Sequence, residues 1–190
     1  MKGDFSRIRF DRQSSYTSVL TQQGRVQLDS DANEQRAIDE YLRATGLIDI
    51  IGRTGTPIHD LGMAISLTSS DDSILIGPGR YYVDGLLCES DTTLDYRKQP
   101  YLINPQPDIT IMLRELQAGK VQALQVWLEA WQRLVTPIDD PCIKDVALGE
   151  ADTTVRRQTV WRVVVERAPE ATRNDKRTCC QIMHDPVRQD

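Results

Sequence analysis

One stretch constrains the fold of this 190-residue chain more than any other, the run SILIGPGRYYVDGLLCE from Ser73 to Glu89. It holds three short runs of apolar and β-branched residues, separated by Gly-Pro-Gly and by Asp84-Gly85. An Asp-Gly pair between two such runs is typical of a tight hairpin, because both central residues of the favoured turn have positive φ. We therefore expect an antiparallel β-meander over residues 63–94.

A well-marked helix is predicted near residues 30–45, SDANEQRAIDEYLRAT. Asp29 or Ser30 is a suitable N-cap, and Gly46 provides a C-terminal stop. The apolar side chains recur at helical spacing and form one stripe: Ile38, Tyr41, Leu42 and Thr45. After this helix, residues 47–62 contain several glycines and a proline without a sustained period, which indicates a connector.

The second half of the chain mixes strand and helix patterns. Residues 109–113 are predicted as a short strand, and residues 159–167, TVWRVVVER, as a buried strand rich in β-branched residues. Residues 121–135 match a helical stripe and an alternating strand almost equally, with a slight preference for helix. Residues 139–149 are predicted as a short helix, with Asp140 as cap, Pro141 at the first position and Gly149 as stop.

The first 35 residues are polar and rich in glutamine, yet large apolar side chains recur throughout them. Charged residues interrupt every window long enough for a signal peptide, and the apolar content is too high for a typical disordered tail. We interpret this segment as an extended arm that lies on another protein. Its candidate partner-binding residues are Phe5, Phe10, Tyr16, Leu20, Gln23, Val26 and Leu28.

Composition excludes several classes of function. The formal net charge is −5, and the nearest basic cluster, Arg156-Arg157 with Arg162, is too small for a nucleic-acid backbone. No window approaches the roughly 18 apolar residues of a membrane span, so we expect no direct membrane insertion. The cysteine spacing fits no disulfide framework and is typical of reduced thiols in a protein made in the cytoplasm.

Three stretches together resemble a family found beside phage-tail-like contractile injection systems. They are MKGDFSR with QQGRVQLDSDANEQ, GRYYVDGLLCE at residues 79–89, and VWLEAWQRLVTPIDDPCIKDVALGEADTTVRRQTVWRV at residues 126–163. The resemblance covers about residues 1–165. This chain has Ala32 where the family usually has a tryptophan, and Gly149-Glu150 where the family has a double glycine. The resemblance favours a strand for the segment that includes Val126–Thr136, and we adopt that choice.

The resemblance implies a structural subunit of a tail or baseplate, near the attachment of fibres or spikes, with no known catalytic centre and no cofactor. Its partners would be other tail or baseplate subunits, in a homo- or hetero-oligomer. Whether the finished particle stays in the cytoplasm, attaches to a membrane or is released is left open. The expected fold is α+β, mainly antiparallel β, with arm and helix in residues 1–55, a β-rich domain in residues 56–167 and a polar tail in residues 168–190.

Several polar clusters have both a chemical and a plainer structural interpretation. Cys179, Cys180 and His184 are too few and wrongly spaced for a usual zinc site. Asp139-Asp140 with Glu129 offers paired carboxylates for acting on a sugar, but a helix cap and a solvated turn are favoured. Asp152 and Arg156 are expected to serve local structure rather than to bind an anion.

Nucleophilic catalysis and phosphate binding have no supporting motif. The two histidines, His59 and His184, have no serine or cysteine in a nucleophile context, and residues 77–80 lack a phosphate-loop motif. Trp127, Trp131 and Trp161 leave one alternative, a carbohydrate- or receptor-binding module of a tail fibre. At alternating spacing, such tryptophans are more often core or interface anchors.

Overall fold

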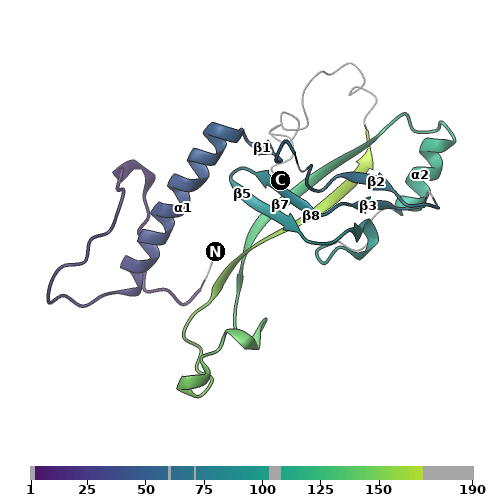
Figure 1. Cartoon of the computed structure of the whole chain (residues 1–190). Helices are drawn as coiled ribbons and strands as arrows, with labels where there is room; N and C mark the ends of the chain where they lie inside the picture. Colours follow the sequence, from purple (N-terminus) through teal and green to yellow (C-terminus); the bar gives the residue numbers. More distant parts are fainter. Residues whose placement is uncertain (1–2, 60, 71, 103–107, 169–190) are drawn as a thin grey trace. The chain divides into compact units, whose positions relative to one another are not determined.

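The computed structural model describes residues 3–59, 61–70, 72–102 and 108–168 (Figure 1). Its helices and antiparallel strands confirm the predicted α+β class. The helices and 3-10 turns are η1 (Arg12–Ser14), α1 (Asp29–Ile51), η2 (Tyr96–Lys98), α2 (Ile109–Gln117), η3 (Pro141–Ile143) and η4 (Val146–Leu148). The strands are β1 (Thr54–Gly55), β2 (Ile65–Leu67), β3 (Ile74–Ile76), β4 (Gly79–Val83), β5 (Leu86–Ser90), β6 (Leu94–Asp95), β7 (Leu124–Val135) and β8 (Arg156–Arg167).

The chain forms two compact units. The first contains Met1–Gly52 and Arg133–Gln158, and the second contains Arg53–Gln132 and the chain from Thr159 onward. The predicted boundary at residue 55 lies close to Gly52. The sequence did not indicate that residues 133–158 group with the N-terminal segment, because that grouping depends on contacts between distant parts of the chain.

The second unit contains two three-stranded sheets, with strand orders β1-β4-β5 and β2-β3-β6. The β4–β5 hairpin turns at Asp84 and Gly85, whose φ angles are 46° and 75°, as the Asp-Gly pair predicts. The single meander expected over residues 63–94 is wrong in one respect, since β3 and β4 lie in different sheets. The intervening Gly77 and Pro78 bond to residues 64 and 63 instead of closing a hairpin.

The two long strands, β7 and β8, form a two-stranded ribbon. Side-chain bonds join Arg133 of β7 to Gln158 of β8, and Glu129 of β7 to Arg162 of β8. Earlier residues of β7 therefore lie beside later residues of β8. This pattern identifies the pair as antiparallel. The strand predicted over residues 159–167 is confirmed, and so is the choice of strand for the tryptophan-rich segment.

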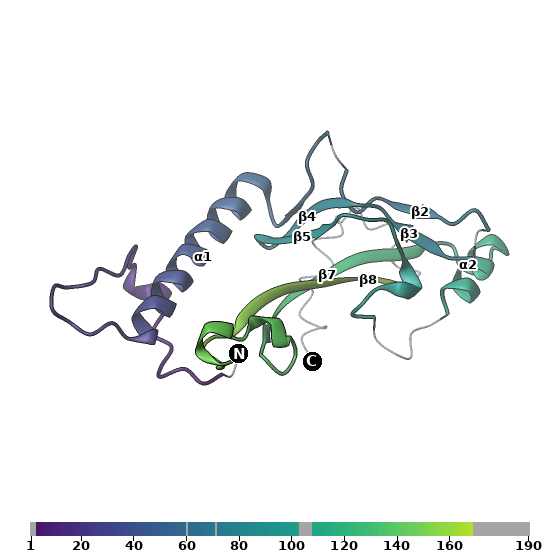
Figure 2. The same cartoon turned by 60° about the horizontal axis from the view of Figure 1, so that its bottom comes forward.

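The main hydrophobic core lies in the second unit, between the short strands and the part of β7–β8 that belongs to it. Figure 2 shows β2, β3, β4 and β5 as one layer over this part of the ribbon, with α2 at one end. The buried members of the core are Met63, Ile74, Ile76, Val83, Cys88, Tyr96, Ile109, Met112, Leu113, Val163 and Val165. The core raises the pKa of the Cys88 thiol to about 11, because burial disfavours the thiolate.

The strand predicted at residues 109–113 is wrong, because this segment is the beginning of helix α2. Asp108 caps the helix, its carboxylate accepting a 2.9 Å hydrogen bond from the amide of Thr110. Ile109, Met112 and Leu113 are buried at helical spacing, whereas Ile111 is half exposed. The alternation of apolar residues matched a strand, but the burial follows the helical period.

Helix α1 also differs from its prediction at both ends. It continues through Gly46 and ends at Gly52, whose φ is 91° and whose amide bonds to the Ile48 carbonyl at 2.8 Å. Leu28 occupies the N-cap without a side-chain bond, so the expected cap by Asp29 or Ser30 is wrong. The connector predicted over residues 47–62 therefore begins inside α1, and it also contains strand β1.

Residues 139–149 form two 3-10 turns, η3 and η4, instead of one short helix. Asp140 caps the first turn through the amide of Cys142, and Gly149 closes the second with a φ of 69°, so both predicted ends are confirmed. The helix is interrupted because Lys144 is extended and Asp145 caps a new turn.

None of the helices in the described part of the chain combines the length and apolarity that a membrane crossing requires. The tail predicted over residues 168–190 falls outside the described residues, apart from Ala168.

Candidate interaction site

The arm of the first unit, residues 3–28, loops beside helix α1 (Figure 1). The structure divides the seven predicted contact residues into two groups. Phe5 and Phe10 are half-buried, whereas the other five are exposed. Exposure reaches 63% for Tyr16 and 83% for both Leu20 and Val26, so the middle of the arm presents apolar side chains to solvent.

Two polar tethers hold the first part of the arm against the N-terminal end of α1. The Asp29 carboxylate accepts hydrogen bonds from the amide and the hydroxyl of Ser6, at 3.0 and 2.5 Å. Arg9 donates to Asp31 at 2.9 Å, and both side chains are about 30% exposed. Because Asp29 makes these bonds, its carboxylate is part of the arm contact and not a helix cap.

Two further tethers lie along the helix. Phe10 packs on Tyr41 with 5.6 Å between ring centroids, and the Arg12 guanidinium lies 5.9 Å from the same ring. Farther along the arm, the amide of Val19 donates to Gln35 at 2.6 Å. The arm is therefore held at several points, and its exposed apolar residues lie beyond the aromatic contacts.

Charge complements these contacts. Residues 1–28 carry five lysine or arginine side chains and two aspartates, although the whole chain is acidic. Residues 29–51, which form α1, carry six acidic and two basic side chains. A basic arm on an acidic helix gains favourable interactions, which salt weakens because the pairs are partly exposed.

One of these tethers depends on pH. The hydrogen bonds from Ser6 lower the pKa of Asp29 below its ordinary value of 3.8. The Ser6 contact therefore contributes fully above that value, and its contribution is lost as the pH falls through the lowered pKa. At neutral pH this end of the arm stays attached.

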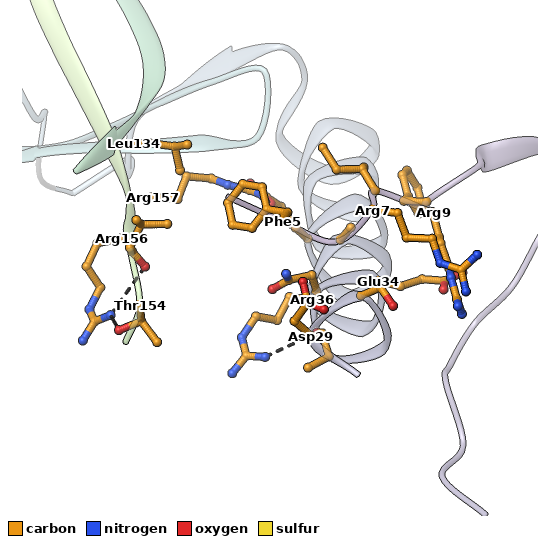
Figure 3. Close-up of a pocket in the computed structure, with 18 residues that line it drawn as sticks. Phe5, Arg7, Arg9, Asp29, Glu34, Arg36, Leu134, Thr154, Arg156 and Arg157 are labelled. Atoms are coloured by element: carbon orange, nitrogen blue, oxygen red, sulfur yellow. Dashed lines mark hydrogen bonds and ion pairs between the residues drawn. The ribbon is translucent and has the colours of Figure 1, made fainter. Parts of the chain in front are cut away.

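A pocket of about 870 Å³ lies in the first unit, between the early arm, α1 and the ends of β7 and β8 that belong to this unit (Figure 3). Its apolar lining includes Phe5, Ile8, Phe10, Leu134 and Val155. Its charged lining consists of Arg7, Arg9, Asp29, Glu34, Arg36, Glu40, Arg156 and Arg157. Sequence reasoning missed this site, because only the fold brings lining residues between 5 and 40 together with those between 134 and 157.

The three tryptophans do not gather into an open platform. Trp127 is buried, and Trp131 packs edge-on against Tyr101 at 5.8 Å. The indole N–H of Trp161 donates to the Glu89 carbonyl at 3.1 Å. These residues are structural anchors, so they give no support to a carbohydrate-binding surface.

The candidate carboxylates serve local structure. Asp139 accepts bonds from the amide and hydroxyl of Thr136, which lower its pKa, and Asp140 caps η3. Glu129 pairs with Arg162 on the neighbouring strand at 2.5 Å. Their bonds favour the structural interpretation of all three.

The other polar candidates are Arg156 with Asp152, His59, and the cysteines and histidine near the C-terminus. Arg156 donates to Thr154 and not to Asp152. His59 is exposed. Within the described residues, no group of three histidine, cysteine, aspartate or glutamate side chains is arranged to hold a metal ion. Cys179, Cys180 and His184 lie outside those residues.

Comparison with known proteins places the chain in a family. No curated protein and no solved structure matches it. The model of one family, described as a family of unknown function (DUF6519), matches residues 1–187. Because the match extends over nearly the whole sequence, the chain belongs to the DUF6519 family.

Proposed function

We propose that this chain is a non-enzymatic structural subunit of a phage-tail-like contractile injection system, at the baseplate or at the attachment region of fibres or spikes. It contacts neighbouring subunits through its N-terminal arm. The placement in such a particle comes from the sequence resemblance. The contact role is carried by one observation, the exposure of Tyr16, Leu20 and Val26 on an arm that is tethered to α1.

Both the exposure and the tethering of the arm favour binding to a neighbour. Burying a large apolar side chain in an interface contributes about 1.5–3 kcal/mol before the costs of association. A free segment would lose much of this gain on being ordered, whereas an arm already held on its helix loses less. A tethered arm with exposed apolar residues is therefore suited to binding a neighbour.

The lack of regular secondary structure in the middle of the arm suggests how the contact is made. Residues 16–22 have no regular secondary structure, and the exposed Tyr16 and Leu20 lie four positions apart. If this segment pairs as a strand, those two positions point to the same side. Extended segments of this kind add to the exposed edge of a sheet, where backbone bonds give affinity and alternate side chains give specificity. A strand edge of a neighbouring subunit is the partner that this geometry favours.

Site-specific photo-cross-linking tests the proposal. A photoreactive phenylalanine analogue replaces Leu20 in a tagged chain expressed in the native host, and cross-linked proteins are identified by mass spectrometry. We expect adducts with subunits of the particle. Ile58, which is 86% exposed in the second unit, is the matched control position. The proposal fails if Leu20 yields no intermolecular adduct, or only the same adducts as Ile58.

A further inference from the structure

The arginines that line the pocket are not all neutralised. Arg9 pairs with Asp31, and Arg157 pairs with Glu40. Arg36 and Arg156 differ, because among the described residues they donate only to uncharged oxygens. Arg36 donates to the Ala32 carbonyl at 3.3 Å, and Arg156 donates to the Thr154 hydroxyl at 2.6 Å and the Val155 carbonyl at 3.4 Å.

Two of the three carboxylates that line the pocket already have partners. Asp29 accepts two bonds from Ser6, and Glu40 pairs with Arg157. Among the described carboxylates that line the pocket, only Glu34 remains to offset the charge of Arg36 and Arg156. Figure 3 shows Arg36 on the helix and Arg156 on the strand, both away from Arg7 and Arg9.

The pocket also offers apolar surface beside these cations. Phe5, Leu134 and Val155 are half-buried in its lining, and Ile8 is 74% exposed. Guanidinium groups bind carboxylates through paired hydrogen bonds, and apolar walls accommodate leucine or phenylalanine side chains. The apolar walls favour a peptide over inorganic phosphate, because phosphate has no apolar groups to bury.

We propose that this pocket binds an acidic peptide segment with apolar side chains, supplied by a neighbouring subunit. The inference rests on the proposed assembly role but uses a surface distinct from the exposed middle of the arm. The segment's carboxylates pair with Arg36 and Arg156, and its apolar side chains lie against Phe5 and Leu134. The chain's own residues 169–190 are not acidic overall, since they carry four acidic and four basic side chains.

A direct binding measurement tests this inference. The probe is the blocked, fluorescein-labelled peptide Glu-Glu-Leu-Phe-Glu-Glu, titrated with the full-length chain and followed by fluorescence anisotropy. We expect saturable binding that weakens with salt, because it depends on partly exposed charges. The peptide with lysine in place of each glutamate should not bind.

Charge reversal identifies the site. The double variant Arg36→Glu/Arg156→Glu should lose at least about tenfold in affinity, because each guanidinium is replaced by a repelling carboxylate. The matched control is Arg114→Glu/Lys120→Glu, which changes the net charge equally at two exposed positions of the second unit. It should bind the peptide as the parent chain does. Arg36→Gln/Arg156→Gln provides a second test if the reversed variant loses its circular dichroism spectrum.

Several outcomes would overturn the inference. Equal loss in the control variant would indicate general charge attraction, and equal binding of the lysine peptide would remove the carboxylate requirement. Displacement of the peptide by an equal concentration of inorganic phosphate would assign the pocket to small anions. If the peptide fails to bind while Leu20 still cross-links to particle subunits, the assembly proposal stands and only this inference falls.

Discussion

Deleting residues 3–28 is expected to leave the main core folded and to abolish incorporation of the chain into the proposed particle. None of the buried residues of that core comes from the arm, so its urea midpoint should be unchanged. Helix α1 loses the partners of Asp29, Asp31 and Tyr41, so partial loss of helical signal is expected. The measurement is the amount of tagged chain that co-purifies with the particle, relative to full-length chain expressed at the same level.

The deletion separates assembly from folding, because co-purification depends on the arm whereas the urea midpoint depends on the core. Retention of the shortened chain in purified particles at the level of the full-length chain would contradict the arm's role. A lower urea midpoint would show instead that the arm supports the core, and would make loss of incorporation uninformative about contacts.

The largest effect on stability is expected for Gln99→Met. Gln99 is only 5% exposed. Its side-chain amide bonds to both backbone groups of Val163 in β8, as a neighbouring strand would. It accepts a bond from the Val163 amide at 2.6 Å and donates to the Val163 carbonyl at 3.0 Å and the Tyr96 carbonyl at 2.9 Å. Methionine has a similar size but can replace none of these bonds well.

The loss of stability follows from the backbone groups of Val163 and Tyr96 that the substitution leaves without hydrogen-bond partners. A buried polar group that loses its hydrogen bond costs about 1–3 kcal/mol, so the loss for Gln99→Met is expected to be about 3 kcal/mol or more. This is a large share of the roughly 5–15 kcal/mol that stabilises a typical domain. Urea denaturation measures the change, with Lys98→Met at the exposed neighbouring position as control. A change below about 1 kcal/mol would mean that water replaces the side-chain amide.

Features that depend on a few adjacent residues were predictable from the sequence. Asp84-Gly85 makes the predicted hairpin turn, and Asp140 and Gly149 end the 3-10 segment as expected. In these cases the local bonds that the residues make are the same in any fold. The α+β class follows from several such signals together.

Features that depend on tertiary packing were not predictable. The segment that begins at Ile109 alternates like a strand, yet it is a helix because Met112 and Leu113 are buried on one face. Gly46 does not end α1, since half-buried residues 47 and 48 continue the helix. Propensity and pattern are weak compared with packing in both segments.

The candidate site was predicted in part. The apolar residues of the arm were found from composition, but their division into tethered and exposed groups depends on α1. The pocket arginines were not found together, because only the fold of the first unit places Arg36 and Arg156 in the lining of one pocket. Arg156-Arg157 was visible as a small basic cluster, but nothing in the sequence connected it to the helix.

The most direct test of the proposed role changes only the exposed side chains of the arm, through Tyr16→Ser/Leu20→Ser/Val26→Ser. These residues are 63–83% exposed, so the thermal midpoint should match that of the parent chain, while co-purification with the particle should fall at least about tenfold. The control Ile138→Ser/Val146→Ser/Leu148→Ser removes apolar side chains that are 64–93% exposed in the same unit. Loss of incorporation in the arm variant alone is the predicted result. Normal incorporation of the arm variant would contradict a contact role for these residues.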